Sequence, residues 1–153
     1  MRGAIAYLRL YSEYRIRRGG RRIRYIQLKD TAFIYIKRVR INLADYYTLT
    51  QGSTYYSQFG FIPYDSENEI LHAEGILELD QNQRRMKRQK LSKHQWFVDT
   101  FSEFVDCLRY PLIGEAIRCL FKNHPDVIVP YIDTLYQQLK LVKFNNRSWY
   151  LRL

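Results

Sequence analysis

The chain of 153 residues is long enough for one domain with a hydrophobic core, and its 46% apolar and 26% charged residues exclude a disordered polypeptide. No apolar run approaches the roughly 20 residues of a membrane-spanning helix, and residues 1–7 lack the apolar segment of a secretory signal. The net charge of +10 and the 14 tyrosines depart most from the average, and they point to binding partners more than to chemistry.

Residues 4–41 are predicted to form an antiparallel meander of strands. Apolar and polar residues alternate over residues 7–17 and again over 22–28, which is the two-residue period of a β-strand. Gly19 and Gly20 lie between these two segments. Because a Gly-Gly pair accepts positive φ at both central positions of a tight turn, the sequence predicts a β-hairpin with the two glycines at its tip.

This predicted hairpin carries most of the positive charge. Residues 1–30 have a net charge of +7, and eight of their nine basic residues are arginines, whose planar guanidinium groups form paired hydrogen bonds with phosphate or carboxylate. Two other interpretations stay open: a solvated face that keeps the protein soluble, and internal neutralisation by the acidic residues at 65–78. The candidate anion-binding residues of this block are Arg15, Arg17, Arg18, Arg21, Arg22 and Arg24.

A second hairpin and two short helices are predicted next. Residues 32–41 are rich in the β-branched and aromatic side chains that are typical of strands. Residues 43–50 place apolar side chains on one face of a short helix, and Gly52 is suited to end it. Residues 53–54 are suited to cap a second short helix, and Gly60 is predicted to end that helix where a strand begins.

The segment Tyr55-Tyr56-Ser57-Gln58-Phe59-Gly60-Phe61 resembles the aromatic-Tyr-x-x-x-Gly-Phe element near the C-terminal end of the GNAT acetyltransferase core. The wider stretch 27–65 resembles uncharacterised GNAT-like proteins of large nucleocytoplasmic DNA viruses. The resemblance implies a GNAT-like helix–strand corner. It also implies that Tyr56 matches the family's tyrosine beside the thioester sulfur of acetyl-CoA, where a hydroxyl protonates the departing thiolate.

An active GNAT enzyme also holds the acetyl-CoA pyrophosphate in a glycine-rich loop at a helix N-terminus, where backbone N–H groups and the helix dipole attract the anion. In this chain only Arg17-Arg18-Gly19-Gly20 is similar to that loop, and residues 21–28 after it are predicted to form a strand. We therefore expect a protein without catalytic activity and without a cofactor. The alternative is an acetyl-CoA-dependent N-acyltransferase with Tyr56 as the general acid.

Residues 70–79 are predicted to form a further strand, and residues 80–94 a polar linker. The linker has a net charge of +5 and holds the second basic block of the chain. Its candidate anion-binding residues are Arg84, Arg85, Lys87, Arg88, Lys90 and Lys93.

Residues 95–153 are predicted to be helical and to end in a strand. Apolar side chains recur at three- and four-residue steps over residues 96–108, 113–121 and 128–139, and residues 149–153 alternate as a final strand of the sheet. Cys107 and Cys119 lie on two different apolar stripes, so they are predicted to be buried thiols in a reducing compartment. The three histidines are scattered, and no zinc site is expected.

The sequence thus predicts one α+β domain over residues 1–153, with a mixed or antiparallel sheet in residues 1–79, a linker, and a C-terminal helical part. The expected function is that of a basic viral accessory or virion protein that binds nucleic acid or an acidic protein surface, and possible contacts include other virion proteins. On nucleic acid, Tyr14 and Tyr25 lie near the arginines and are suited to stack on unpaired bases. A virion or the cytoplasm of an infected cell is the expected location. A purely structural protein–protein subunit, docking through its tyrosines, is the remaining alternative.

Overall fold

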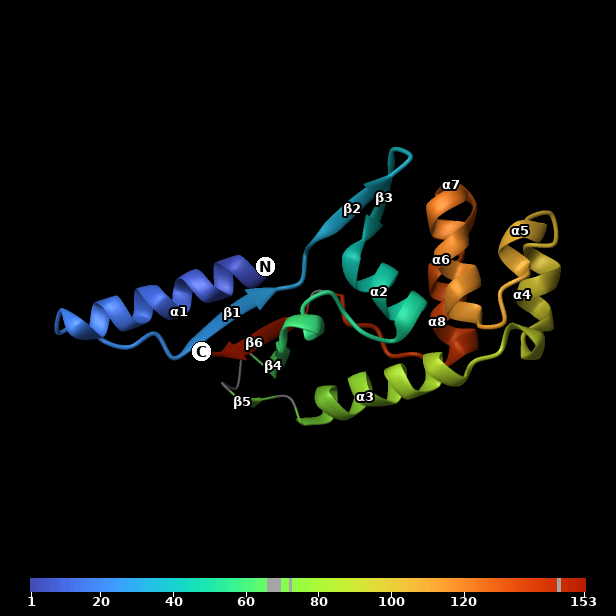
Figure 1. The fold of residues 1–153 in the computed structure, drawn as a ribbon. Coiled ribbons are helices and arrows are strands. Elements are labelled where there is room, and N and C mark those ends of the chain that lie inside the picture. The colour runs from blue at the N-terminus through green and yellow to red at the C-terminus, as the bar shows by residue number, and fades with distance from the viewer. Residues whose placement is uncertain (66–69, 72, 146) are drawn as a thin grey trace.

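The computed structural model describes residues 1–65, 70–71, 73–145 and 147–153, and its fold is α+β, as predicted. A small antiparallel sheet lies beside a group of helices, and a separate hairpin, β2–β3, projects between them (Figure 1). The sheet has four strands in the order β1-β6-β4-β5, with bounds Tyr25–Lys29, Ser148–Arg152, Ile62–Asp65 and Ile70–Leu71.

The last strand, β6, lies in the middle of this sheet and confirms the predicted final strand. It pairs antiparallel with β1, where Tyr25 is opposite Arg152, and with β4, where Ile62 is opposite Tyr150. Alternate residues point to opposite faces of a sheet, so Trp149 and Leu151 of β6 are buried while Arg152 is exposed. The sheet therefore has one face in the core and one face with polar and aromatic side chains.

The predicted hairpin over residues 32–41 is confirmed. Strands β2, Phe33–Ile36, and β3, Val39–Asn42, form a two-stranded antiparallel sheet. Lys37 and Arg38 make the connecting turn, and both have positive φ, 47° and 69°. Positive φ at both central positions matches the right-handed twist of the two strands, although neither residue is a glycine.

The N-terminal part of the predicted meander is wrong, because residues 2–17 form helix α1 (Arg2–Arg17). Ile5 and Ser12, seven residues apart on one helix face, are its buried residues. Tyrosine and leucine residues fit both the two-residue period of a strand and the 3.6-residue period of a helix, so the sequence pattern did not distinguish the two. Gly19, with φ of +76°, follows the end of α1, and the N–H of Gly20 donates to the Arg15 carbonyl. The glycine pair thus follows a helix C-terminus, not a hairpin turn between two strands.

The predicted strand over 70–79 and linker over 80–94 are also wrong. Only Ile70–Leu71 is strand, residue 72 lies outside the described residues, and helix α3 spans Ala73–Arg88. Its buried residues Leu79, Asn82 and Met86 recur at helical spacing, but one of them is an amide, so the apolar periodicity was invisible. A short 3₁₀ helix, η2, follows at Leu91–Lys93.

Helix α2 (Leu43–Gln51) and the 3₁₀ helix η1 (Ser57–Phe59) confirm the two short helices predicted between the hairpin and β4. Asn42 caps α2 by accepting the N–H of Ala44 at 2.8 Å. Gly52 ends α2 with φ of 72°, and Gly60 ends η1 with φ of 84°. A Cβ on Gly52 would lie 2.3 Å from the backbone oxygen of Asn82, so this glycine also allows α2 to approach α3 closely.

The C-terminal part is helical, as predicted. Helix α6 is its centre and buries five apolar side chains as well as Gly114. Short helices surround α6 on either side along the chain (Figure 1). The elements are α4 (Gln95–Thr100), α5 (Val105–Leu108), α6 (Ile113–Asn123), α7 (Pro125–Ile128), η3 (Val129–Tyr131) and α8 (Ile132–Leu139).

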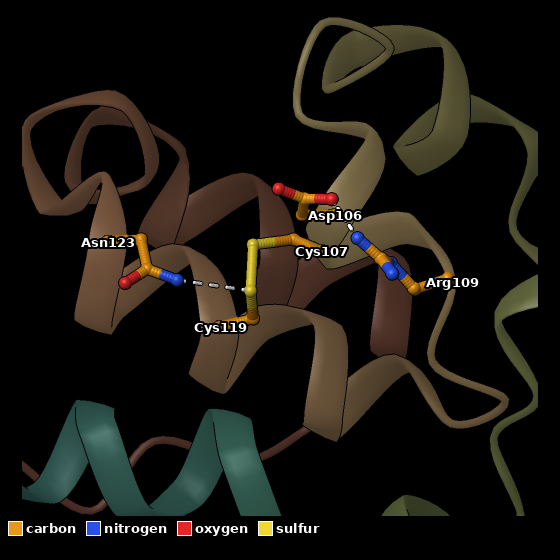
Figure 2. A network of polar contacts seen from close by, with 5 residues as sticks. All are labelled: Asp106, Cys107, Arg109, Cys119 and Asn123. Carbon is orange, nitrogen blue, oxygen red and sulfur yellow. Dashed lines mark hydrogen bonds and ion pairs between the residues drawn. A yellow bond between two sulfur atoms is a disulfide. The ribbon is translucent and has the colours of Figure 1, made fainter.

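Cys107 of α5 and Cys119 of α6 form a disulfide, so the prediction of two free thiols is wrong (Figure 2). The two apolar stripes that carry them pack against each other, which brings the sulfur atoms together. The Asn123 side chain donates a hydrogen bond to the Cys119 sulfur at 3.4 Å. Beside the bridge, Asp106 of α5 forms an exposed ion pair with Arg109, the residue that follows this helix.

The buried side chains form two clusters. The larger one lies among α2, the end of α3 and the C-terminal helices, and it includes Met86, Phe97 and Leu120. The smaller one lies between the sheet and α1, and it includes Ile5 and Trp149. Asn82 lies between them: its amide donates to the Val142 carbonyl at 2.8 Å and accepts the Val142 N–H at 3.0 Å.

We expect Asn82→Ala to lower the free energy of unfolding by about 2 to 3 kcal/mol, because two hydrogen bonds vanish and the backbone of Val142 loses both partners. Urea titration followed by circular dichroism measures the change. The control is Gln81→Ala, at an exposed position one residue away on the same helix. Equal, small losses in both variants would contradict a structural role for the Asn82 amide.

Removal of the disulfide should lower the free energy of unfolding by about 3 kcal/mol, because the bridge closes a loop between residues 12 positions apart. We expect a reductant to shift the denaturation midpoint of the wild-type protein and to leave the Cys107→Ser/Cys119→Ser variant unchanged. A wild-type midpoint that does not respond to the reductant would contradict this bridge.

Candidate anion-binding surface

The first basic block lies where α1 ends and the chain returns toward β1. Ser12 is buried on α1 and joins the two segments, because its hydroxyl accepts the N–H of Ile23 at 2.9 Å and donates to the carbonyl of Ile23 at 3.2 Å. The segment 21–24 is thereby held alongside α1 (Figure 1). The arginines of this block sit on a fixed backbone, although they do not form the predicted hairpin tip.

Four arginines line two neighbouring hollows at this end of the sheet. A cavity of about 330 Å³ is lined by Arg22, Arg24, Arg152 and Leu153, and Arg21 lines a neighbouring hollow together with Arg22 and Arg24. Arg152 belongs to β6 and reaches this place because it is paired with Tyr25 at the start of β1. We call Arg21, Arg22, Arg24 and Arg152 the arginine hollow. The sequence did not indicate Arg152, since only the strand pairing brings it here.

The remaining arginines of the block, Arg15, Arg17 and Arg18, lie at the C-terminal end of α1. Arg15 and Arg17 are in the last turn, where cationic side chains offset the partial negative charge of the helix end. The Arg18 guanidinium lies over the ring of Tyr14, 5.0 Å from the ring centroid. These side chains add further positive charge at the C-terminal end of α1.

Among the side chains that the structure describes, which do not include that of Asp65, no carboxylate forms an ion pair with these seven arginines. Of the acidic residues considered for internal neutralisation, Glu78 pairs with Arg147 at 2.8 Å. Glu67 and Glu69 lie outside the described residues. Self-repulsion among the arginines is relieved by a bound anion, so the arrangement favours anion binding.

The second basic block lies elsewhere. Five of its members are on α3 or just after it, and Figure 1 shows the C-terminal ends of α1 and α3 at opposite ends of the molecule. Arg84 pairs with Asp80 at 2.7 Å, and Arg85 donates to the carbonyl of Lys140. The two blocks therefore do not form one surface, and the second is carried by a helix instead of the linker. Its exposed residues are Arg84, Arg85, Lys87, Arg88, Lys90 and Lys93.

Tyr56 lies in the smaller core, where it is 9% exposed and its ring contacts those of Phe61 and Trp149. Burial raises the pKa of Tyr56, and the nearby Asp30 adds to the rise, so the hydroxyl stays protonated at neutral pH. The residues similar to a pyrophosphate loop, Gly19 and Gly20, follow the C-terminus of α1. A pyrophosphate at that place would meet the negative end of the α1 dipole.

Two buried carboxyl groups, Asp30 and Asp45, were not indicated by the sequence analysis. Asp30 is fully buried, and neither of its carboxyl oxygens has a hydrogen-bond partner among the described residues. Asp45 is also buried and accepts a hydrogen bond from the Tyr136 hydroxyl at 2.9 Å. Burial raises the pKa of Asp30 to about 6, with a further contribution from Asp45, and burial also raises the pKa of Asp45.

Comparisons of the chain with protein-family models, with curated proteins and with solved structures found no match. None of the described helices is long and apolar enough to cross a membrane. Within the same residues, no three His, Cys, Asp or Glu side chains gather into a group that would hold a metal ion.

Asp30 should make the protein less stable as the pH rises. Its folded pKa of about 6 lies above the ordinary value of 3.8, so its contribution to stability is fully present below about pH 4 and is lost as the pH rises through 6. We expect Asp30→Asn to be more stable than the wild type by about 3 kcal/mol at pH 7.5, with the difference vanishing near pH 4.

Urea titrations of both proteins across this pH range measure the difference. Glu103→Gln, at an exposed carboxyl, is the control and should follow the wild type. A constant difference between Asp30→Asn and the wild type over the whole range would show that Asp30 does not titrate in this window.

Proposed function

We propose that the protein binds a polyanion, and nucleic acid in particular, through the arginine hollow and the adjoining end of α1. The observation that carries the proposal is the convergence of arginines from the 21–24 segment and β6, with no ion-paired carboxylate among the side chains that the structure describes. Guanidinium groups bind phosphate oxygens through paired hydrogen bonds, and each neutralised phosphate releases counterions.

Nucleic acid suits this surface better than an acidic protein does. Besides the arginines of the hollow, Arg15 and Arg17 lie in the last turn of α1, so the basic side chains occupy more than a single pocket. A nucleic acid presents a regular line of phosphates to several such groups. Because contacts with phosphate carry no sequence information, binding through these arginines is expected to be without sequence preference.

The resemblance of residues 27–65 to GNAT-like viral proteins supports a second part of the proposal: a non-catalytic accessory or virion protein on a GNAT-like scaffold. The corner in which η1 ends at Gly60 and β4 begins is compatible with this resemblance. In this proposal Tyr56 is a core aromatic that holds the corner against β6. Acetyl-CoA-dependent N-acyl transfer, with Tyr56 as the general acid, is the catalytic alternative.

Replacing Arg21, Arg22, Arg24 and Arg152 together with Ser should weaken binding to a 20-base-pair duplex at least tenfold. The log–log salt slope should become shallower by about 0.9 for each phosphate contact that is lost. Fluorescence anisotropy at several salt concentrations measures both quantities. The matched control replaces Lys87, Arg88, Lys90 and Lys93 with Ser, which removes the same charge from the other end of the molecule.

The control variant should keep most of the affinity. Equal losses in the two variants would mean that net charge alone attracts the nucleic acid, and would contradict a site at the arginine hollow. A wild-type protein that binds polyglutamate but neither duplex nor single strand would replace nucleic acid by an acidic protein as the partner.

A further inference from the structure

Helix α1 turns an aromatic face toward the solvent. Tyr7, Tyr11 and Tyr14 follow one another at steps of four and three residues, so they lie along one side of the helix. Their exposed fractions are 66%, 42% and 51%. The opposite side of the same helix is the one that buries Ile5 and Ser12 against the rest of the protein. We call the three exposed side chains the tyrosine row.

The tyrosine row is ordered and leads to the basic C-terminal end of α1. The rings of Tyr7 and Tyr11 are parallel, with an interplanar angle of 6° and centroids 6.2 Å apart. Tyr14 continues the row, and the Arg18 guanidinium lies over its ring. Arg15 and Arg17 lie in the same last turn of α1, whereas the 21–24 segment packs against the opposite side of the helix through Ser12. The row thus ends among the arginines of α1 itself.

We propose that the tyrosine row stacks the unpaired bases of a single-stranded nucleic acid whose phosphates lie on the neighbouring arginines. This inference rests on the proposed function and specifies the class of nucleic acid. Aromatic rings interleaved with cationic side chains are the features by which proteins hold single strands without regard to sequence. In a duplex the base faces are covered by their neighbours, so a row of rings gains nothing from them.

The charge around the row favours this occupant. Residues 1–24 hold eight arginines and one acidic residue, so a second copy of the same face would bring like charges together. A lipid bilayer favours aliphatic and Phe or Trp side chains on a helix that lies in its surface. Here the face consists of hydroxyl-bearing rings with one aliphatic neighbour, Leu10. A polyanion with exposed aromatic bases matches both the charge and the rings.

The test replaces Tyr7, Tyr11 and Tyr14 together with Leu, which keeps the apolar area, the charge and the helix propensity but removes the rings. We expect at least a tenfold loss of affinity for a 20-nucleotide oligothymidine and less than a twofold change for a 20-base-pair duplex. The Tyr→Phe variant at the same three positions keeps the rings and should bind oligothymidine as the wild type does. Tyr35→Leu and Tyr110→Leu, at exposed tyrosines elsewhere, are the matched controls.

Each outcome either supports or contradicts base stacking by the tyrosine row. If the Leu variant binds oligothymidine as well as the wild type, the row does not stack on bases, whereas the arginine hollow still stands if its own variant loses affinity. If oligothymidine and duplex affinities fall together, the row acts on nucleic acid without distinguishing strands, and the inference is wrong. Stronger binding of the Leu variant to vesicles of phosphatidylserine, or self-association in sedimentation, with unchanged oligothymidine affinity would assign the face to a membrane or to a second copy.

Discussion

The fold depends on the contact between the Asn82 side chain and the backbone of Val142. Asn82 is the buried polar residue of α3, and it is flanked along that helix by Leu79 of the smaller core and Met86 of the larger one. Val142 lies between Leu141 of the larger core and Phe144 of the smaller one. The two hydrogen bonds thus join the two clusters at the boundary between them. The close approach of Gly52 to the same turn of α3 brings α2 to this joint as well.

The protein carries positive charge on its surface at the end of α1 and acidic groups in its interior. The surface at the end of α1 gathers arginines without ion-paired carboxylates among the described residues, while Asp30 and Asp45 are buried with raised pKa values. With a pKa of about 6, Asp30 is mostly ionised at neutral pH and bears the desolvation cost of its buried charge, whereas the arginines at the surface are charged in contact with water. The positive face arises from the gathering of these arginines, and it is the property on which the proposed function depends.

Local turn chemistry could be predicted from the sequence, and several elements follow from it. Gly52 and Gly60 have the positive φ values that their places after short helices require, and the β2–β3 hairpin and the strand at residues 148–152 were predicted from their side-chain patterns. In each case the signal is confined to a few neighbouring residues. The C-terminal helices were predictable for the same reason, because their apolar stripes recur without interruption.

Long-range pairing could not be predicted, and the errors follow from it. Helix α1 was missed because tyrosines on its outward face imitate the alternation of a strand, and α3 was missed because its contact residue at the centre is the amide of Asn82. The disulfide depends on how α5 packs against α6, and Arg152 joins the hollow only through the register of β6. The periodicity of one segment carries no information about its partner 100 or so residues away.

The position of β6 in the middle of the sheet delays the completion of the sheet during synthesis of the protein. During synthesis the N-terminal strands emerge from the ribosome long before residues 148–152, yet β6 lies between β1 and β4 in the finished sheet. Until that strand arrives, β1 lacks a neighbour and β4 is paired with β5 alone, so the edges of β1 and β4 that face β6 are unpaired. Nascent chains therefore expose two unpaired strand edges, which are templates for pairing with other chains. The helices of residues 95–139 contact mostly near neighbours in sequence and complete their part first, so the sheet is the last element to close.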